Sequence, residues 1–137
     1  MLLPLLQGEK MQAKFEIKLA ANEEYMFNLF ATNGKIVATS ETYTTLQSCM
    51  GGIESIRNNA VAHVEDMTAE PHEVLTCPKF ELFSDKEGKF RFRLRASNGE
   101  IICASQGYTT KDSAMTGIAS VKANAPVAAI VYLDQDF

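Results

Sequence analysis

Residues 14–60 read KFEIKLAANEEYMFNLFATNGKIVATSETYTTLQSCMGGIESIRNNA, and residues 79–125 read KFELFSDKEGKFRFRLRASNGEIICASQGYTTKDSAMTGIASVKANA. The two stretches align without a gap at a constant shift of 65, and 20 of their 47 positions are identical. An internal repeat of this length indicates one structural unit used twice. The architecture therefore depends on what one copy forms and on how two copies share a core.

Each copy begins with three segments in which apolar and polar residues alternate, the period expected of half-buried strands. In the first copy these segments cover 14–18, 25–31 and 36–40, and the second copy repeats them. An Asn-Gly pair separates the second and third segments in both copies, which predicts a hairpin with a type I′ turn. The third strands are expected to turn these residues toward the core: Ile36, Ala38, Ser40, Ile101, Cys103 and Ser105.

A helix is expected after the third strand of each copy. Thr44 with Gln47, and Thr109 with Asp112, resemble the capping box that begins a helix. The predicted helices bury one apolar stripe each. The stripes consist of Cys49, Ile53, Ile56 and Ala60, and of Ala114, Ile118, Val121 and Ala125.

Glycine occupies the same interior position of both predicted helices, at Gly52 and Gly117. Glycine inside a helix costs about 1 kcal/mol relative to alanine, so its use in both copies predicts a close approach to another element. The helices are expected to end near Asn59 and Asn124, which tolerate a left-handed cap.

A further extended segment is expected after each helix, clearly at 127–133 and more weakly at 61–68. The repeating unit is then β-β-β-α-β. This interpretation divides the chain into an N-terminal extension and one domain, 14–137, that contains two repeats and an acidic connector. The ranges are 1–13 for the extension, 14–68 for the first repeat, 69–78 for the connector and 79–133 for the second repeat.

The composition indicates an ordinary globular protein, with 46% hydrophobic and 22% charged residues among 137. A net charge of −4 argues against a dedicated duplex-DNA-binding protein, which normally carries a strong basic stripe. Three cysteines provide no disulfide framework and favour the cytoplasm. The leucine-rich run at 2–6 is too short for a signal-peptide core or a membrane span.

Three motifs occur in both copies: N-G-x-I, S-x-x-Y-T-T, and G-I-x-S followed by a hydrophobic residue, a basic residue and, after one more position, Asn. With these motifs the sequence resembles the YegP-like family of uncharacterised bacterial proteins over about 14–133. The resemblance implies that two units, each of three strands, a helix and a strand, join into one antiparallel sheet with their final strands exchanged. We therefore predict an α+β fold with a pseudo-twofold axis and both helices on one face of the sheet. It implies no reaction, because the family has no established activity. The N-terminal extension and the Gly51-Gly52 pair depart from the pattern.

The residues that commonly carry catalysis or bind metals are sparse. His63, His72 and Cys77 match no zinc signature and are expected to be solvent-facing loop residues. Cys49 and Cys103 lie on predicted inward faces, where they behave as small hydrophobic residues. No paired carboxylates, phosphate-binding loop or nucleophile motif is present. The sequence therefore predicts no metal and no cofactor, and it argues against an enzyme.

Tyr43 and Tyr108, each followed by two threonines, mark the junction between the third strand and the helix in both copies. Two such corners could line a ligand groove. A structural role explains them as well: a threonine caps the helix, and the tyrosine hydroxyl bonds to the backbone at the corner.

Arg91, Arg93 and Arg95 alternate with apolar residues, so all three are expected on the exposed sheet face. Met26, Asn28 and Phe30 are their counterparts in the first repeat. Cross-strand pairing with Glu16, Glu81 and Glu100 would neutralise the arginines, and the leucines at 2–6 would cover Met26 and Phe30. Alternatively, the face binds a partner or an anionic ligand.

Two classes of function follow from this surface. The first is a small non-enzymatic binding or interaction module that uses the open sheet face, for a protein or another anionic partner. The second is a nucleic-acid-associated protein in which the arginines contact phosphates while Phe30 or Phe83 stacks on bases. No membrane association is expected, and the chain is expected to be a monomer or a weak homodimer. The candidate surface comprises Arg91, Arg93, Arg95, Met26, Phe30, Tyr43 and Tyr108.

Overall fold

The same succession of three strands, a helix and a final strand occurs twice along the chain, as the repeat predicts. The computed structural model describes residues 11–133. Within them the elements are β1 (Lys14–Leu19), β2 (Tyr25–Phe30), β3 (Ile36–Ser40), α1 (Leu46–Asn59), β4 (Val64–Asp66), β5 (Lys79–Ser84), β6 (Phe90–Arg95), β7 (Ile101–Ala104), α2 (Lys111–Asn124) and β8 (Ala129–Tyr132).

These strands form one sheet in the order β4-β5-β6-β7-β3-β2-β1-β8. The final strand of each repeat lies beside the first strand of the other repeat, which confirms the predicted exchange. The six central strands are antiparallel, but β4 pairs with β5, and β8 with β1, in parallel. The sheet is therefore mixed rather than wholly antiparallel. The long connector between β4 and β5 permits parallel pairing, which a short hairpin does not, and β1 and β8 are not consecutive strands.

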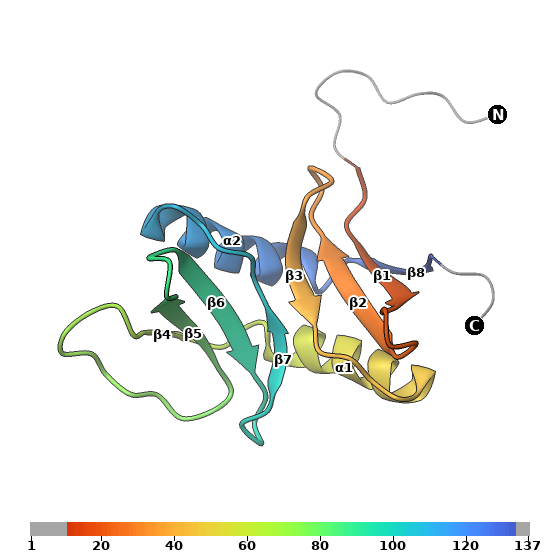
Figure 1. Cartoon of the computed structure of the whole chain (residues 1–137), viewed down its shortest axis with the longest axis horizontal. Coiled ribbons are helices and arrows are strands. Elements are labelled where there is room, and N and C mark those ends of the chain that lie inside the picture. The colour runs from red at the N-terminus through yellow and green to blue at the C-terminus, as the bar shows by residue number, and fades with distance from the viewer. Residues whose placement is uncertain (1–10, 134–137) are drawn as a thin grey trace.

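Both helices cover the same face of the sheet, behind it in Figure 1. Helix α1 contacts β6 and β7 of the other repeat as well as β2, while α2 contacts β3 and β6. All eight residues of the two predicted helical stripes are buried. They pack against inward-facing side chains that include two edge-to-face aromatic pairs, Phe15 with Phe27 and Phe80 with Phe92. The core consequently draws on both repeats.

The helix caps lie one residue later than the sequence analysis predicted. The side chains of Thr45 and Thr110, rather than Thr44 and Thr109, accept the amide N–H groups of Ser48 and Ser113. The second threonine has the extended backbone that points its oxygen at an orphan amide of the first turn.

The helices end at Asn59 and Asn124, as predicted, but without a left-handed residue. Ala60, the residue after the first helix, has φ −64°. Each asparagine side chain instead donates to a serine carbonyl one turn earlier, at Ser55 or Ser120, and so remains part of the helix.

The Asn-Gly hairpins are not type I′ turns. Gly34 and Gly99 have positive φ, whereas Asn33 and Asn98 do not. Ala31 donates to Lys35 O across the turn, so three residues form a loop that ends in a left-handed glycine. A register shift follows in both copies, between Leu29 and Phe30 and between Leu94 and Arg95.

This bulge changes which side chains of β3 and β7 are buried. Val37 and Ile102 are buried, whereas Ile36 is 41% exposed and Ile101 is partly exposed. The predicted inward orientation of Ile36 and Ile101 is therefore wrong. A bulge places two residues opposite one, and the simple alternation of the strand fails at that position.

Candidate functional site

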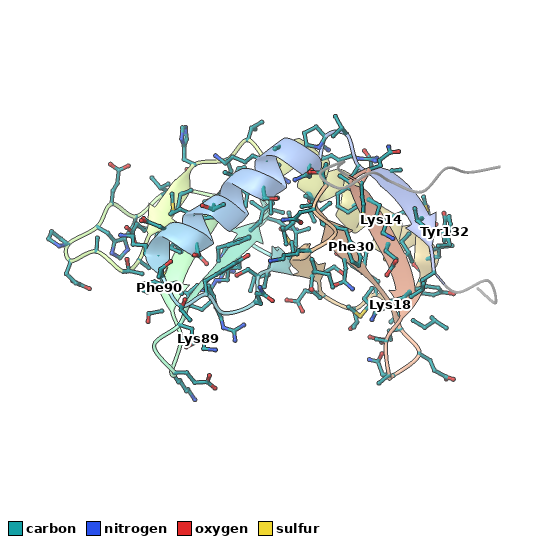
Figure 2. All side chains as sticks on the ribbon, turned by 90° about the horizontal axis from the view of Figure 1, so that it is seen from above. Lys14, Lys18, Phe30, Lys89, Phe90 and Tyr132 are labelled. Atoms are coloured by element: carbon teal, nitrogen blue, oxygen red, sulfur yellow. The ribbon has the colours of Figure 1, made fainter. Side chains whose placement is uncertain are left out.

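The face of the sheet opposite to the helices, here called the open face, is the surface to which the sequence analysis pointed. Figure 2 shows the outer hairpins near Lys18 and Lys89 extending away from the helices on either side of the sheet centre. One residue from every strand forms a transverse row across this face. In strand order the row consists of Glu65, Glu81, Arg93, Ala104, Thr39, Asn28, Glu16 and Val131.

In the second repeat, Glu81 is the centre of a charge network. Its Oε1 accepts from Arg93 Nε at 2.5 Å and from Arg95 Nε at 2.7 Å, and the Glu81 side chain is only 7% exposed. Burial alone would raise the pKa of Glu81, but the hydrogen bonds from the two guanidinium groups outweigh it and lower this pKa to about 2. Glu81 is therefore ionised at neutral pH and compensates part of the arginine charge.

Of the three predicted acidic partners of the arginines, only Glu81 has this role among the described residues. Arg91 pairs instead with Asp85 in the preceding turn, Nε to Oδ2 at 2.6 Å. Glu16 lies 3.3 Å from Lys14 Nζ. Neither Glu16 nor Glu100 has an ion pair with an arginine in residues 11–133. Asp85 could not be anticipated from cross-strand pairing, because it lies in the hairpin turn that precedes Arg91.

The network continues to the edge of the sheet through a second buried carboxylate. Glu65 Oε1 accepts from Lys79 Nζ at 2.7 Å and from the Leu75 amide at 2.8 Å, and His72 Nε2 lies 3.3 Å from Oε2. These bonds, chiefly the one from Lys79, lower the pKa of Glu65. Glu65 thus attaches the acidic connector to the sheet, and His72, predicted to face solvent, is partly buried beside it.

Arg93 differs from its neighbours in how its guanidinium group is used. Arg91 and Arg95 each donate a terminal nitrogen to a backbone carbonyl, at Ser105 and Gly99. Arg93 bonds only through Nε to described residues, and its guanidinium group lies 4.5 Å from the centre of the Phe83 ring. Its side chain is 26% exposed. Glu81 and the Phe83 ring therefore fix the Arg93 guanidinium group through its Nε and one ring contact, and its terminal nitrogens face solvent.

The first-repeat half of the open face is less charged. Asn28, the counterpart of Arg93, is buried and accepts a hydrogen bond from Thr39 at 2.7 Å. Met26 and Phe30, two residues to either side, are partly exposed. Lys14 lies 4.9 Å from the centre of the Phe30 ring, and Figure 2 shows the two side chains together. The leucines at 2–6, predicted to cover this patch, lie outside the described residues.

Tyr43 and Tyr108 are on the helix side of the strand ends and do not join the arginine row as a group. Each hydroxyl lies against the helix glycine of its own repeat: a Cβ on Gly52 would be 2.3 Å from Tyr43 Oη, and one on Gly117 would be 2.7 Å from Tyr108 Oη. The predicted tight packing at both glycines is confirmed, but side chains of a tyrosine and a phenylalanine approach each glycine, rather than the backbone of another element. Neither hydroxyl bonds to the backbone within residues 11–133, contrary to the predicted anchor. Burial is the main cause that raises the pKa of Tyr43 to about 12.

Each tyrosine lines a cleft between the helix of its own repeat and the β2–β3 or β6–β7 hairpin of the other. The cleft at Tyr108 has a volume of about 510 Å³ and contains Lys35, whereas that at Tyr43 has about 290 Å³ and contains Glu100. Tyr43 and Arg95 also line a common shallow hollow. Of the predicted site residues, the structure thus places the three arginines in one row and Tyr43 beside Arg95, whereas Met26 and Phe30 lie on β2 to either side of Asn28.

The remaining reactive side chains in the described part of the chain include two buried cysteines and scattered histidines and carboxylates. Cys49 and Cys103 are buried, and burial raises the pKa of their thiols to about 11 and about 12. No three His, Cys, Asp or Glu residues between 11 and 133 are placed to hold a metal ion. No helix in that range is long and apolar enough to span a membrane.

Comparison with known proteins agrees with the duplicated architecture. A family described as "Domain of unknown function (DUF1508)" matches residues 20–66 and again residues 85–131. The chain is therefore a tandem pair of such domains. It is 38% identical over 120 residues to the UPF0339 protein PA0329 of Pseudomonas aeruginosa, covering 88% of this chain and 96% of that one. It is 40% identical over 110 residues to the UPF0339 protein YegP of Escherichia coli, covering 80% and 87%.

Two solved structures have the same fold. The solution structure of YegP from E. coli has a TM-score of 0.74 at 35% identity and covers 95% of this chain and 100% of its own. That of the UPF0339 protein SO3888 from Shewanella oneidensis has a TM-score of 0.73 at 30% identity and covers 92% and 95%. The chain belongs to the UPF0339 (YegP) family, whose members have no assigned function.

Proposed function

We propose that the protein is a non-enzymatic binding module whose open face receives a protein partner that carries acidic and apolar side chains. The charge of this face supports the proposal. Although the whole chain has a net charge of −4, the open-face side chains of the strands include six cations and three carboxylates. These are Lys14, Lys18, Lys79, Arg91, Arg93 and Arg95, and Glu16, Glu65 and Glu81. A cationic face on an acidic protein selects for an acidic partner.

The exposed aromatic rings favour a protein over a nucleic acid. Stacking on bases requires an accessible ring face on Phe30 or Phe83. A cation lies over each of these rings, Lys14 over Phe30 and Arg93 over Phe83. Met26 and Phe30 are better suited to apolar side chains of a protein, which pack against a ring edge and a thioether.

Affinity capture with the immobilised chain tests this function. We expect the Met26→Ser/Phe30→Ser variant to lose a partner that the wild type retains. Met115→Ser is the matched control, because Met115 is exposed on α2, on the opposite side of the molecule. Equal loss in the control, or capture unaffected by the double variant, would contradict the proposal. Titration with single-stranded oligonucleotides at low salt tests the alternative, since tight and strongly salt-dependent binding would favour a nucleic-acid-associated protein.

We further propose a cytoplasmic location. All three cysteines are unpaired, and two of them are buried. This pattern is usual where thiols remain reduced. Fractionation of the native host with an antibody against the chain tests this location, and recovery from an oxidising compartment would contradict it.

A further inference from the structure

The terminal nitrogens of Arg93 form a prepared position for an anion. The Nε–Glu81 hydrogen bond and the Phe83 ring hold the guanidinium plane before any ligand arrives. Ordering a flexible arginine normally costs part of the binding free energy, and here the fold has already ordered it. Two terminal nitrogens on one guanidinium edge match the two oxygens of a carboxylate.

The neighbouring row positions carry small side chains. Ala104 and Thr39, small residues of β7 and β3, separate Arg93 from Asn28. They also line a hollow of about 380 Å³ at the junction of the two repeats. On the far side, Met26 and Phe30 flank Asn28 on β2. The centre of the open face therefore has a cation on one side, small residues in the middle and an apolar pair on the other side.

We propose that an extended acidic segment of a partner protein crosses the centre of the open face, with a Glu or Asp carboxylate bound by Arg93 and an apolar side chain on Met26 and Phe30. Three strand spacings separate Arg93 from Asn28, a distance of about 14 Å. An extended chain advances about 3.3 Å per residue, so the two partner residues are about four positions apart. Residues four apart in an extended chain point to the same side, as this geometry requires.

The proposal rests on the proposed function and is tested with two synthetic peptides. The first is acetyl-Glu-Ser-Gly-Ser-Leu-amide, and the second has Gln in place of Glu. We expect the Glu peptide to shift the amide resonances of β6, β7, β3 and β2 in a ¹⁵N NMR titration. We expect the Gln peptide, and the Arg93→Gln variant with the Glu peptide, to bind at least about fivefold more weakly.

Three further binding measurements distinguish a specific carboxylate contact at Arg93 from general charge attraction. Lys86→Gln removes a cation from the exposed β5–β6 turn and should leave peptide binding unchanged. Arg93→Lys retains the charge without the planar pair of donors and should recover only part of the affinity. An oligothymidine ten-mer should bind more weakly than the Glu peptide.

Equal binding of the two peptides, absence of binding at millimolar concentration, or an unaffected Arg93→Gln variant would each overturn the inference. Tighter binding of the oligonucleotide would do so as well. If Met26→Ser/Phe30→Ser still abolishes partner capture while Arg93→Gln does not weaken peptide binding, the proposed function stands and only the carboxylate position is wrong.

Discussion

The two halves of the open face are built on corresponding strands of the two repeats, yet among the described residues the second-repeat half alone carries a charge network. Both halves retain a Lys and a Glu on the first strand, Lys14 and Glu16 against Lys79 and Glu81. In the second repeat the next strand adds three arginines, and Glu81 gains two guanidinium partners. In the first repeat the equivalent positions hold Met26, Asn28 and Phe30, and within residues 11–133 Glu16 forms an ion pair with Lys14 alone.

The inward faces of the two repeats, by contrast, have hardly diverged. Phe15 and Phe27 correspond to Phe80 and Phe92 with the same edge-to-face contact, and Gly52 corresponds to Gly117. A core position is constrained by every neighbour it touches, whereas an exposed strand position tolerates substitution. The fold therefore requires the inward-facing residues that the two repeats share, whereas the two repeats differ at the exposed positions of the open face.

The largest expected effect concerns the cooperativity of the two halves. Because the helices contact strands of both repeats and the outer strands are exchanged, we expect a single unfolding transition for the whole chain. Calorimetry measures this directly, since the calorimetric and van't Hoff enthalpies should agree. Two separate transitions would show that the repeats have independent cores, against the single-domain division predicted from the sequence.

Gly117→Leu should destabilise the protein by roughly 2–4 kcal/mol, because a side chain there overlaps Tyr108 and Phe92. Gly52→Leu should cost about the same in the first half, where Tyr43 and Phe27 occupy the space. Gly51→Ala is the control: nothing lies within 4 Å of its Cβ, so it should be neutral or stabilise by up to about 1 kcal/mol. Urea unfolding measures all three, and an unchanged midpoint for Gly117→Leu would contradict the close-approach interpretation.

Glu81→Gln and Glu16→Gln compare the two carboxylates directly. Glu81→Gln leaves Arg93 and Arg95 without their shared counterion and should cost about 1–3 kcal/mol. Glu16→Gln removes a single contact with a partly exposed lysine and should cost less than about 1 kcal/mol. Equal effects in urea unfolding would mean that the network contributes nothing beyond a single surface ion pair.

The pH dependence of stability provides a second test of the Glu81 network. Because the folded pKa of Glu81, about 2, lies below that of an unfolded glutamate, about 4.3, its contribution is complete above pH of about 4.3 and is lost as the pH falls toward 2. Glu81→Gln should therefore lose less stability than the wild type over this interval. Thermal unfolding between pH 2 and 6 provides the measurement, and parallel curves for the wild type and Glu81→Gln would contradict the assignment.

The smallest effect is expected for Arg93→Gln, which should change the unfolding free energy by well under about 1 kcal/mol, as partly exposed ion pairs do. Glu81 would retain Arg95 and Lys79 as partners. A loss of more than about 2 kcal/mol would show that Arg93 is chiefly structural, and its proposed role in binding would lose support.

The sequence was informative wherever one residue type and its local spacing determine the outcome. The repeat, the alternation and the helical stripes predicted the order of the elements, and the glycines at 52 and 117 predicted the close approach. The predictions from the sequence were wrong where a shift of one residue in the backbone determines which side chain caps a helix or enters the core. One threonine rather than its neighbour caps each helix, and a bulge exchanges Ile36 for Val37 in the core. The partners of Glu65 could not be predicted, because residues ten and fourteen positions away reach it only once β4 and β5 pair.

The exchange of the outer strands has a consequence for the topology of the chain. The final strand of each repeat pairs with the first strand of the other repeat. The connector at 69–78 therefore joins two parts that are already held together by strand pairing. A chain cut in this connector is expected to remain one particle, as two fragments held together by three strand ladders, β4–β5, β3–β7 and β1–β8, and a common core. Size-exclusion chromatography after a single cleavage would show one peak of unchanged size, with two bands appearing only on denaturation. The two repeats are therefore expected to associate as two separate fragments would, without needing the covalent link between them.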